Sequence, residues 1–329
     1  MQERTLGRTG RTVSSIGLGT WQLGADWGEV DEGEALDVLS ASVEAGVTFF
    51  DTADVYGDGR SESVIGRFLR ENPDAGLTVA TKMGRRGPQE PGEFTLANFR
   101  AWTDRSRRNL GVDTLDLVQL HCPPTPVFSS DAVYDALDTL VEEGAIAAYG
   151  VSVETCDEAL AAIARPGTAT VQIILNAFRL KPLDQVLPAA QDAGVGIIAR
   201  VPLASGLLSG KYTTSTTFAA DDHRSYNRDG SAFDVGETFS GVDYARGVEA
   251  AQKFSALVES TLPGATPAAA ALAWVAAQPG VSTVIPGARS RTQAASNAAA
   301  GSLVVPAALN AGVHELYEEY FKAAIHPRW

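Results

Sequence analysis

The chain alternates between short apolar runs and longer amphipathic stretches, after an opening with the pattern of a β-hairpin. In that opening, Glu3–Leu6 and Thr12–Ser14 flank a turn at Gly7–Gly10. Eight apolar runs of strand length follow at Ser15–Leu18, Val47–Phe50, Thr78–Thr81, Leu115–Leu120, Ala147–Val151, Thr170–Ile174, Gly196–Ala199 and Thr283–Ile285. Because these runs are continuously apolar, we expect parallel strands that are covered on both faces.

Amphipathic helical patterns separate these runs, at Asp31–Ala45, Ser61–Arg70, Leu96–Leu110, Asp131–Glu143, Cys156–Ala164 and Pro182–Ala193. Residues that typically cap helices precede or begin three of them: Asp31, Ser61 and Thr95. Glycines end several, namely Gly46, Gly111, Gly144 and Gly194. Further helices are expected at Tyr244–Leu262, at Thr266–Ala277, which we expect to be buried, and at Pro306–Phe321.

Eight strand–helix pairs in 329 residues favour a (β/α)8 TIM barrel with an N-terminal β-hairpin and additional helices. An open doubly wound sheet is the alternative that the pattern leaves. No linker interrupts the chain, so we expect a single domain over residues 1–329. The polar segment Thr213–Asp243 is long for a loop inside a compact domain, which indicates a lid or a binding loop.

Charge and composition narrow the choice of partners and compartment. The net charge of −14 argues against nucleic acid and anionic membrane as partners. Only two cysteines are present, Cys122 and Cys156, so no disulfide framework is implied. The opening segment lacks the apolar core of a signal peptide, and no run approaches the roughly 20 apolar residues of a membrane span. We therefore expect a cytoplasmic protein.

Ionisable residues follow three successive predicted strands, at the end where barrels of this kind place their active sites. They are Asp51 and Tyr56 after the second strand, Lys82 after the third and His121 after the fourth. A free phenol has a pKa of about 10, and a nearby ammonium such as Lys82 lowers it. Asp51 would balance the lysine, and His121 would donate a hydrogen bond to a carbonyl oxygen. Because no side chain donates hydride, carbonyl reduction by this set needs a reduced cofactor.

Each of these residues taken alone has an ordinary structural interpretation. Asp51 could be a turn residue, Tyr56 a packing residue, Lys82 a solvated charge and His121 a structural histidine. The functional interpretation rests on their recurrence at successive strand ends. The four histidines of the chain are widely spread, so we predict no catalytic metal.

The motifs around these residues resemble those of the aldo-keto reductase family. FFDTADVYGDGRSE, the TK pair at Lys82 and LVQLHCPP are similar to the tetrad motifs of that family. The opening LGRTGRTVSSIGLGTWQLG, then GVSVET, RVPLASGLLSGKY and VIPGARSRTQAASN, follow in the family's order from about residue 3 to residue 300. The resemblance implies that Asp51, Tyr56, Lys82 and His121 form the catalytic tetrad. It also implies NAD(P)H bound extended across the barrel mouth.

The function implied by the resemblance is NADPH-dependent reduction of a small-molecule carbonyl substrate: an aldehyde, a ketone or a keto-sugar. Tyr56 would protonate the carbonyl oxygen. The alternative is a non-catalytic NADPH-binding regulatory subunit, since some barrels of this family serve membrane channels. Trp21 is expected to form a wall of the substrate pocket together with Tyr56 and His121, whereas Trp27 is expected to pack at the rim. His223, Arg224, Tyr226 and Arg228 fall in the long polar segment, where we expect a solvated loop, with contact to substrate or cofactor as the alternative.

Cofactor residues follow from the same resemblance. Ser152 and Gln172 are expected at the nicotinamide carboxamide, and Arg200 stands where many members carry a stacking aromatic ring. Residues expected near the ring and the pyrophosphate are Pro202, Leu203, Ser205, Gly206, Leu207 and Lys211. If the resemblance is set aside, a structural role is an equally good interpretation: Ser152 would be a turn serine and Gln172 a buried glutamine. Lys211 would then be an exposed charge.

The helix start after the last strand is expected to bind the adenosine end of the cofactor through its free N–H groups. Its candidate residues are Gly287, Arg289, Gln293 and Asn297. Arg289 would pair with a 2′-phosphate, which favours NADPH over NADH. Many relatives carry a lysine where Gly287 stands and an acidic residue where Ser296 stands, and both are absent here. Surface arginines at an ordinary helix start are the structural alternative.

Overall fold

Eight parallel strands form one sheet in the computed structural model, which describes residues 1–24 and 31–329. The strands run in chain order from β3 to β10, each paired with its neighbours. Parallel bridges between Ile16 and Val284 and between Gly19 and Gly287 bring the two ends of the sheet together. The sheet is therefore a nearly closed barrel, as the alternation of strands and helices predicts, and not an open doubly wound sheet.

The barrel strands lie within a few residues of the predicted runs. They are β3 (Leu18–Gly19), β4 (Phe49–Asp51), β5 (Thr78–Met83), β6 (Leu117–His121), β7 (Tyr149–Ser152), β8 (Thr168–Ile174), β9 (Gly196–Arg200) and β10 (Val281–Val284). The first is the least accurate prediction, because only Leu18 of the predicted run Ser15–Leu18 lies in β3, while Ile16 forms an isolated bridge to Val284.

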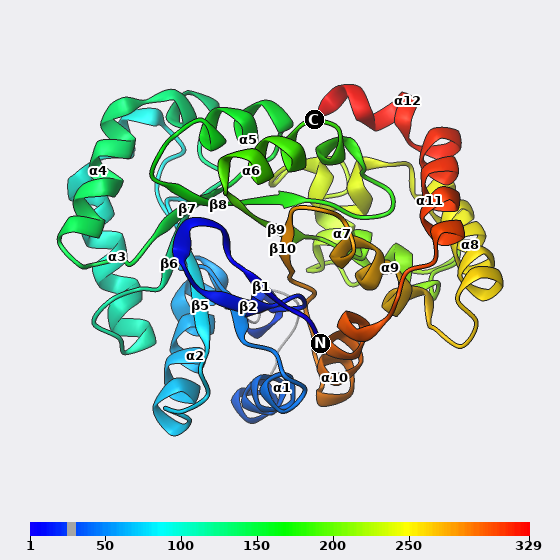
Figure 1. Cartoon of the computed structure of the whole chain (residues 1–329), viewed down its shortest axis with the longest axis horizontal. Helices are drawn as coiled ribbons and strands as arrows, with labels where there is room; N and C mark the ends of the chain where they lie inside the picture. The colour runs from blue at the N-terminus through cyan, green and yellow to red at the C-terminus, as the bar shows by residue number, and fades with distance from the viewer. Residues whose placement is uncertain (25–30) are drawn as a thin grey trace.

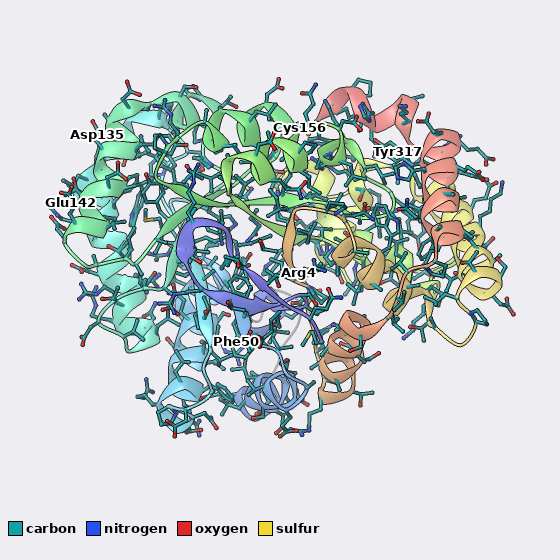
Figure 2. The ribbon with its side chains drawn as sticks, in the orientation of Figure 1. Arg4, Phe50, Asp135, Glu142, Cys156 and Tyr317 are labelled. Carbon is teal, nitrogen blue, oxygen red and sulfur yellow. The ribbon has the colours of Figure 1, made fainter. Side chains whose placement is uncertain are left out.

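Helices surround the barrel (Figure 1). The longer ones are α1 (Glu32–Glu44), α2 (Arg60–Glu71), α3 (Leu96–Leu110), α4 (Asp131–Glu142), α5 (Cys156–Ile163), α6 (Val186–Ala193), α8 (Tyr244–Thr261), α9 (Pro267–Ala276), α10 (Arg291–Ala299) and α11 (Ala307–Tyr320). Two short helices are α7 (His223–Tyr226) and α12 (Lys322–Ile325). Figure 2 shows Asp135 and Glu142 of α4 at the outer edge of the molecule, as expected of an amphipathic helix. Among the described residues, no helix is both long and apolar enough to cross a bilayer.

The predicted hairpin, β1 (Glu3–Thr5) paired antiparallel with β2 (Thr12–Ser14), crosses the barrel axis in Figure 1. Leu6 and Val13 are fully buried beside Phe49 and Leu117, the first residues of β4 and β6. The hairpin therefore plugs the end of the barrel where the strands begin. A functional site is left to the opposite end, where the strands finish.

The start of α2 differs from the prediction in a way that bears on the site. Ser61 does not cap this helix, because α2 begins one residue earlier, after Gly59 in the left-handed conformation (φ 93°). The Ser61 hydroxyl is instead buried, accepts a hydrogen bond from Thr52 Oγ1 at 2.9 Å and donates to Thr20. It thereby joins the chain after β3 to the chain after β4. Asp31 and Thr95 cap their helices as predicted.

Two other helix predictions have clear outcomes. The predicted Pro182–Ala193 helix is split into a 3-10 turn at Lys181–Leu183 and α6. The Ala-rich helix α9 is buried as expected, with Trp274 fully enclosed. Its indole Nε1 donates to Asn310 Oδ1 at 2.9 Å, which ties α9 to α11.

Candidate active site

The four residues predicted as a tetrad meet at the end of the barrel where the strands finish. Asp51 and His121 are the last residues of β4 and β6, and Lys82 is the penultimate residue of β5. The Lys82 ammonium donates to Asp51 Oδ1 at 2.5 Å, to the Thr52 carbonyl at 2.9 Å and to the Tyr56 hydroxyl at 3.3 Å. The His121 ring meets the Tyr56 ring edge-on, with 6.0 Å between centroids. The spacing of 5, 26 and 39 residues along the chain thus becomes one cluster.

Two glutamines complete the surroundings of Asp51. Its Oδ2 accepts hydrogen bonds from Gln172 Nε2 at 2.8 Å and from Gln119 Nε2 at 3.1 Å. Sequence reasoning missed Gln119. The available signal was strand periodicity, since a residue two positions before His121 on β6 faces the same side of the sheet. Both oxygens of the buried carboxylate are therefore satisfied, which holds Asp51 and the lysine in place.

Protonation states in the cluster are set mainly by burial. Burial raises the pKa of the Tyr56 phenol, and although Lys82 lowers it, Asp51 and Glu237 raise it further, so the net direction is upward. Lys82 lowers the pKa of the phenol, as expected, but burial, Asp51 and Glu237 together outweigh that effect. Burial lowers the pKa of the Lys82 ammonium, but Asp51 and Tyr56 raise it above its usual value. Tyr56 is thus held as a neutral phenol beside a charged lysine.

His121 is held neutral. Burial lowers the pKa of its imidazole well below the usual value, and the positive charges of Arg85, Lys82 and Arg200 lower it further. Its Nδ1 has no hydrogen-bond partner among the described residues. A neutral imidazole that can donate a hydrogen bond therefore faces the phenol of Tyr56.

A cavity of about 740 Å³ opens over this cluster. Residues predicted for the site that line it are Trp21, Asp51, Tyr56, His121, Ser152, Gln172, Arg200, Pro202, Leu203, Ser205, Gly206 and Gly287. Other predicted residues are not part of its wall: Lys82 and Leu207 are buried behind it, and Lys211, Arg289, Gln293 and Asn297 lie outside it. The cavity thus joins the tetrad to the loop after β9 and to the start of the α10 segment.

Arg200 lies in the cavity wall between two carboxylates. It is 6% exposed, donates to the Val153 carbonyl at 2.9 Å and forms ion pairs with Glu154 and Glu237. Burial lowers the pKa of its guanidinium, but these two carboxylates raise it well above the usual value. The sequence analysis predicted Arg200 as a site residue but did not predict its ion-pair partners. Glu237 lies in the long polar segment Thr213–Asp243, far from Arg200 in the chain.

The Thr213–Asp243 segment folds over the cavity. The His223 ring is buried against Trp21, with 5.3 Å between ring centroids, and Phe233 meets the same indole edge-on. The expectation of a solvated loop is therefore wrong for His223, and Arg224 and Tyr226 also line the cavity. Arg228 is exposed and lies over the Tyr244 ring. Trp27, expected to pack at the rim, lies outside the described residues.

Trp21 itself is placed as predicted. Its indole stacks on Tyr56, with 6.1 Å between ring centroids and 21° between planes. It therefore forms a wall of the cavity between Tyr56 and the Thr213–Asp243 segment.

The start of α10 is organised by its own side chains. Gln293 Oε1 accepts from the Arg289 backbone N–H at 2.8 Å, and Asn297 Nδ2 donates to the Gly287 carbonyl at 3.1 Å. These two side chains shape the loop, and the Arg289 side chain is exposed beside it. A Cβ at Gly287 would lie 2.2 Å from Gln22 Nε2, so the Gln22 side chain fills the space that a larger residue at this position would need.

The barrel and its cluster match a known protein family. A model described as the Aldo/keto reductase family matches residues 15–318. An uncharacterized oxidoreductase of Mycobacterium tuberculosis is 33% identical over 306 residues, 90% of this chain and 86% of the relative. A probable voltage-gated potassium channel subunit beta of Arabidopsis thaliana is 29% identical, over 90% of each chain.

Solved structures of aldo-keto reductases and of a related dehydrogenase superpose on this chain. The glycerol dehydrogenase from Gluconobacter oxydans superposes with a TM-score of 0.80 and 28% identity, covering 97% of this chain and 95% of its own. An aldo-keto reductase from Klebsiella pneumoniae, solved in complex with NADPH, superposes with a TM-score of 0.71 and 25% identity over 96% of each chain. This chain belongs to the aldo-keto reductase family and is an NAD(P)H-dependent oxidoreductase.

The polar groups of the cavity fit a nicotinamide cofactor. The Gln172 side-chain nitrogen donates to Asp51 and Gln119, and no described residue donates to its carbonyl oxygen, which remains an acceptor for an amide. The Ser152 hydroxyl accepts from the Cys122 thiol at 3.4 Å and so keeps its own proton to donate. The Gln172 oxygen can accept from the N–H group of a carboxamide, and the Ser152 hydroxyl can donate to its carbonyl oxygen. Among the described residues, no three His, Cys, Asp or Glu side chains gather as a metal ion would require.

Asp54, two residues before Tyr56, makes stability depend on pH. It is 1% exposed, and its Oδ1 has no partner among the described residues. Burial and the nearby Glu62 raise its pKa to about 7. Because the folded state then holds a proton that the unfolded chain releases near pH 4, stability falls as pH rises from about 4 to about 7.

We therefore expect Asp54→Asn to be more stable than the parent above neutrality. The gain should grow between pH 5 and pH 8 and reach on the order of 1–3 kcal/mol. Thermal unfolding over this pH range measures it, with the exposed Asp74→Asn as the control. A stability difference that does not change with pH would contradict the assignment.

Proposed function

We propose that this protein reduces carbonyl compounds with NADPH, and that Tyr56 delivers the proton. The observation that carries the proposal is the position of the Tyr56 hydroxyl, 3.3 Å from the Lys82 ammonium and exposed to a cavity that His121 also lines. Aldehydes, ketones and keto-sugars are the substrate classes that this chemistry accepts.

Each residue of the cluster is assigned a role from its charge and its position. Bound NADPH supplies the hydride that reaches the carbonyl carbon. The neutral His121 donates a hydrogen bond to the carbonyl oxygen and orients it. The Tyr56 proton moves to that oxygen, and the phenolate left behind lies beside Lys82, whose charge stabilises it. Asp51 keeps Lys82 protonated. The products are the alcohol and the oxidised cofactor.

The remaining cavity residues are assigned to cofactor binding. Gln172 and Ser152 would hold the carboxamide, and Arg200, fixed between its two carboxylates, would contact the nicotinamide ring. Pro202 lines the same wall, and the chain from Leu203 through Ser205, Gly206 and Leu207 toward Lys211 would hold the pyrophosphate. Gly287, Gln293 and Asn297 would hold the adenosine end. Arg289 would pair with the 2′-phosphate.

A panel of carbonyl compounds, followed by loss of NADPH absorbance, tests the proposed function. We expect NADPH oxidation with at least one aldehyde or ketone, and quenching of tryptophan fluorescence on NADPH binding because Trp21 lines the cavity. Tight NADPH binding without oxidation by any compound would instead support the alternative, a non-catalytic NADPH-binding regulatory subunit. The observation favouring that alternative is the similarity to a potassium channel subunit.

Cofactor preference has its own expected result. Arg289→Ala should weaken NADPH binding roughly 10- to 100-fold and leave NADH binding unchanged, because a charge-assisted pair with the 2′-phosphate is lost. Fluorescence titration with both cofactors measures it. The matched control is Arg291→Ala, since Arg291 pairs with Glu44 at 2.7 Å and does not line the cavity. Equal weakening for both cofactors would refute the assignment of Arg289.

Three further expectations stay predictions: a single domain over residues 1–329, a cytoplasmic location and the absence of nucleic-acid or membrane partners.

A further inference from the structure

Arg85 is a partly buried arginine that faces the cavity. It follows β5, three residues after Lys82, and it lines the cavity close to the ring of Phe233, 5.9 Å from its centroid. Its neighbour Arg86 does not line the cavity and pairs with Asp58 at 2.5 Å. Two consecutive arginines thus have different surroundings.

The other cations around the cavity all have acidic partners. Lys82 pairs with Asp51, Arg200 with Glu154 and Glu237, and Arg224 with Asp222. Within residues 1–24 and 31–329, no carboxylate lies within ion-pair distance of Arg85, and Asp221, the remaining acid in the cavity wall, is exposed and unpaired with it. Among the described residues that line the cavity, Arg85 is therefore the cation without an acidic partner.

The position of Arg85 places this charge on the substrate side. It comes from the strand next to β4 and β6, which carry Asp51 and His121, whereas the proposed cofactor residues come from β7 onward. Among the charged groups that lower the pKa of His121, Arg85 has the largest effect. Arg85 and His121 therefore line the same cavity, where a carbonyl oxygen would meet His121.

Resting on the proposed function, we propose that Arg85 binds a carboxylate of the substrate, so that the preferred substrates are carbonyl compounds carrying a carboxylate at the end away from the reacting group. A guanidinium presents paired N–H donors in the plane that a carboxylate matches. One uncompensated cation balances one monoanionic group. The nearby Phe233 ring provides an apolar surface for the carbon skeleton between the two ends.

The test compares a carboxylate substrate with its neutral isostere, 4-carboxybenzaldehyde with 4-formylbenzamide, by steady-state kinetics with NADPH. We expect the parent to prefer the carboxylate. Arg85→Gln should lower kcat/KM for the carboxylate roughly 10- to 100-fold, mainly through KM, and change the amide by less than about threefold. Arg85→Lys should keep part of the preference, because it keeps the charge but not the paired donors.

Arg86→Gln is the matched control, since it removes a neighbouring guanidinium that lies outside the cavity wall. It should behave as the parent with both aldehydes. Equal kcat/KM for the two aldehydes in the parent, or equal losses for both in Arg85→Gln, would overturn the proposal.

A binding measurement separates this proposal from the proposed function. Calorimetry with 4-(hydroxymethyl)benzoate in the presence of NADPH needs no turnover, and Arg85→Gln should raise the Kd roughly 10- to 100-fold. If no aldehyde is reduced but this Kd still rises, carbonyl reduction fails and the carboxylate site stands. If aldehydes are reduced and neither the Kd nor the preference depends on Arg85, the carboxylate site fails and carbonyl reduction stands.

Discussion

Replacing Tyr56 by phenylalanine should abolish turnover while leaving NADPH binding intact. The substitution keeps the ring that stacks on Trp21 and meets His121, and removes only the hydroxyl that Lys82 contacts. Loss of a general acid of this kind lowers kcat by about 10²–10⁴-fold. Steady-state kinetics and a fluorescence titration with NADPH measure the two effects separately.

The matched control removes a tyrosine hydroxyl far from the cavity. Tyr320 on α11 donates to Glu249 at 2.7 Å and has no part in the cavity wall, so Tyr320→Phe should retain parental kinetics. A Tyr56→Phe enzyme that reduced a good substrate at the parental rate would show that another group delivers the proton. Parallel loss of NADPH binding would point to a collapsed site instead.

Removing the Lys82 ammonium should cost both stability and activity. Lys82→Met leaves Asp51, 2% exposed, as a buried carboxylate without its cation. Breaking a buried ion pair in this way costs about 3–5 kcal/mol, which the hydrogen bonds from Gln119 and Gln172 offset in part. Denaturant unfolding of the variant and the parent measures the loss.

The double variant Lys82→Met/Asp51→Asn separates the two consequences. With no unpaired charge left in the barrel, most of the lost stability should return. Turnover should stay at least about a hundredfold below the parent, because no cation stabilises the Tyr56 phenolate. Recovery of turnover together with stability would mean that Lys82 acts only through folding.

The strands and helices of this fold could be predicted from local sequence patterns. Continuous apolar runs predict parallel strands, and the amphipathic stretches between them predict the helices, because both signals lie within a few neighbouring residues. The limits of this reasoning show at Ser61. Its residue type suits a helix cap, yet its hydroxyl bonds Thr20 and Thr52, contacts that exist only when β3 and β4 are side by side.

The tetrad could be predicted for a related reason. Parallel strands in a barrel end at the same rim, so residues that follow successive strands are brought together wherever they lie in the chain. Trp21 was instead expected in the pocket wall from the resemblance to the aldo-keto reductase family, and it lines the cavity. The reasoning from strand ends did not include Gln119, because this residue lies within the apolar run of β6 and not after the strand, and the structure shows its hydrogen bond to Asp51.

By itself the sequence determined the order of elements and the rim of the barrel at which Asp51, Tyr56, Lys82 and His121 gather. Tertiary structure alone decided which charges are compensated. Glu237 reaches Arg200 from the long polar segment, and Arg85 is left facing the cavity while Arg86 finds Asp58. It also raised the pKa of the Tyr56 phenol, through burial and the nearby carboxylates of Asp51 and Glu237. Pairing and burial depend on groups distant in the chain, whereas strand and helix patterns depend on near neighbours.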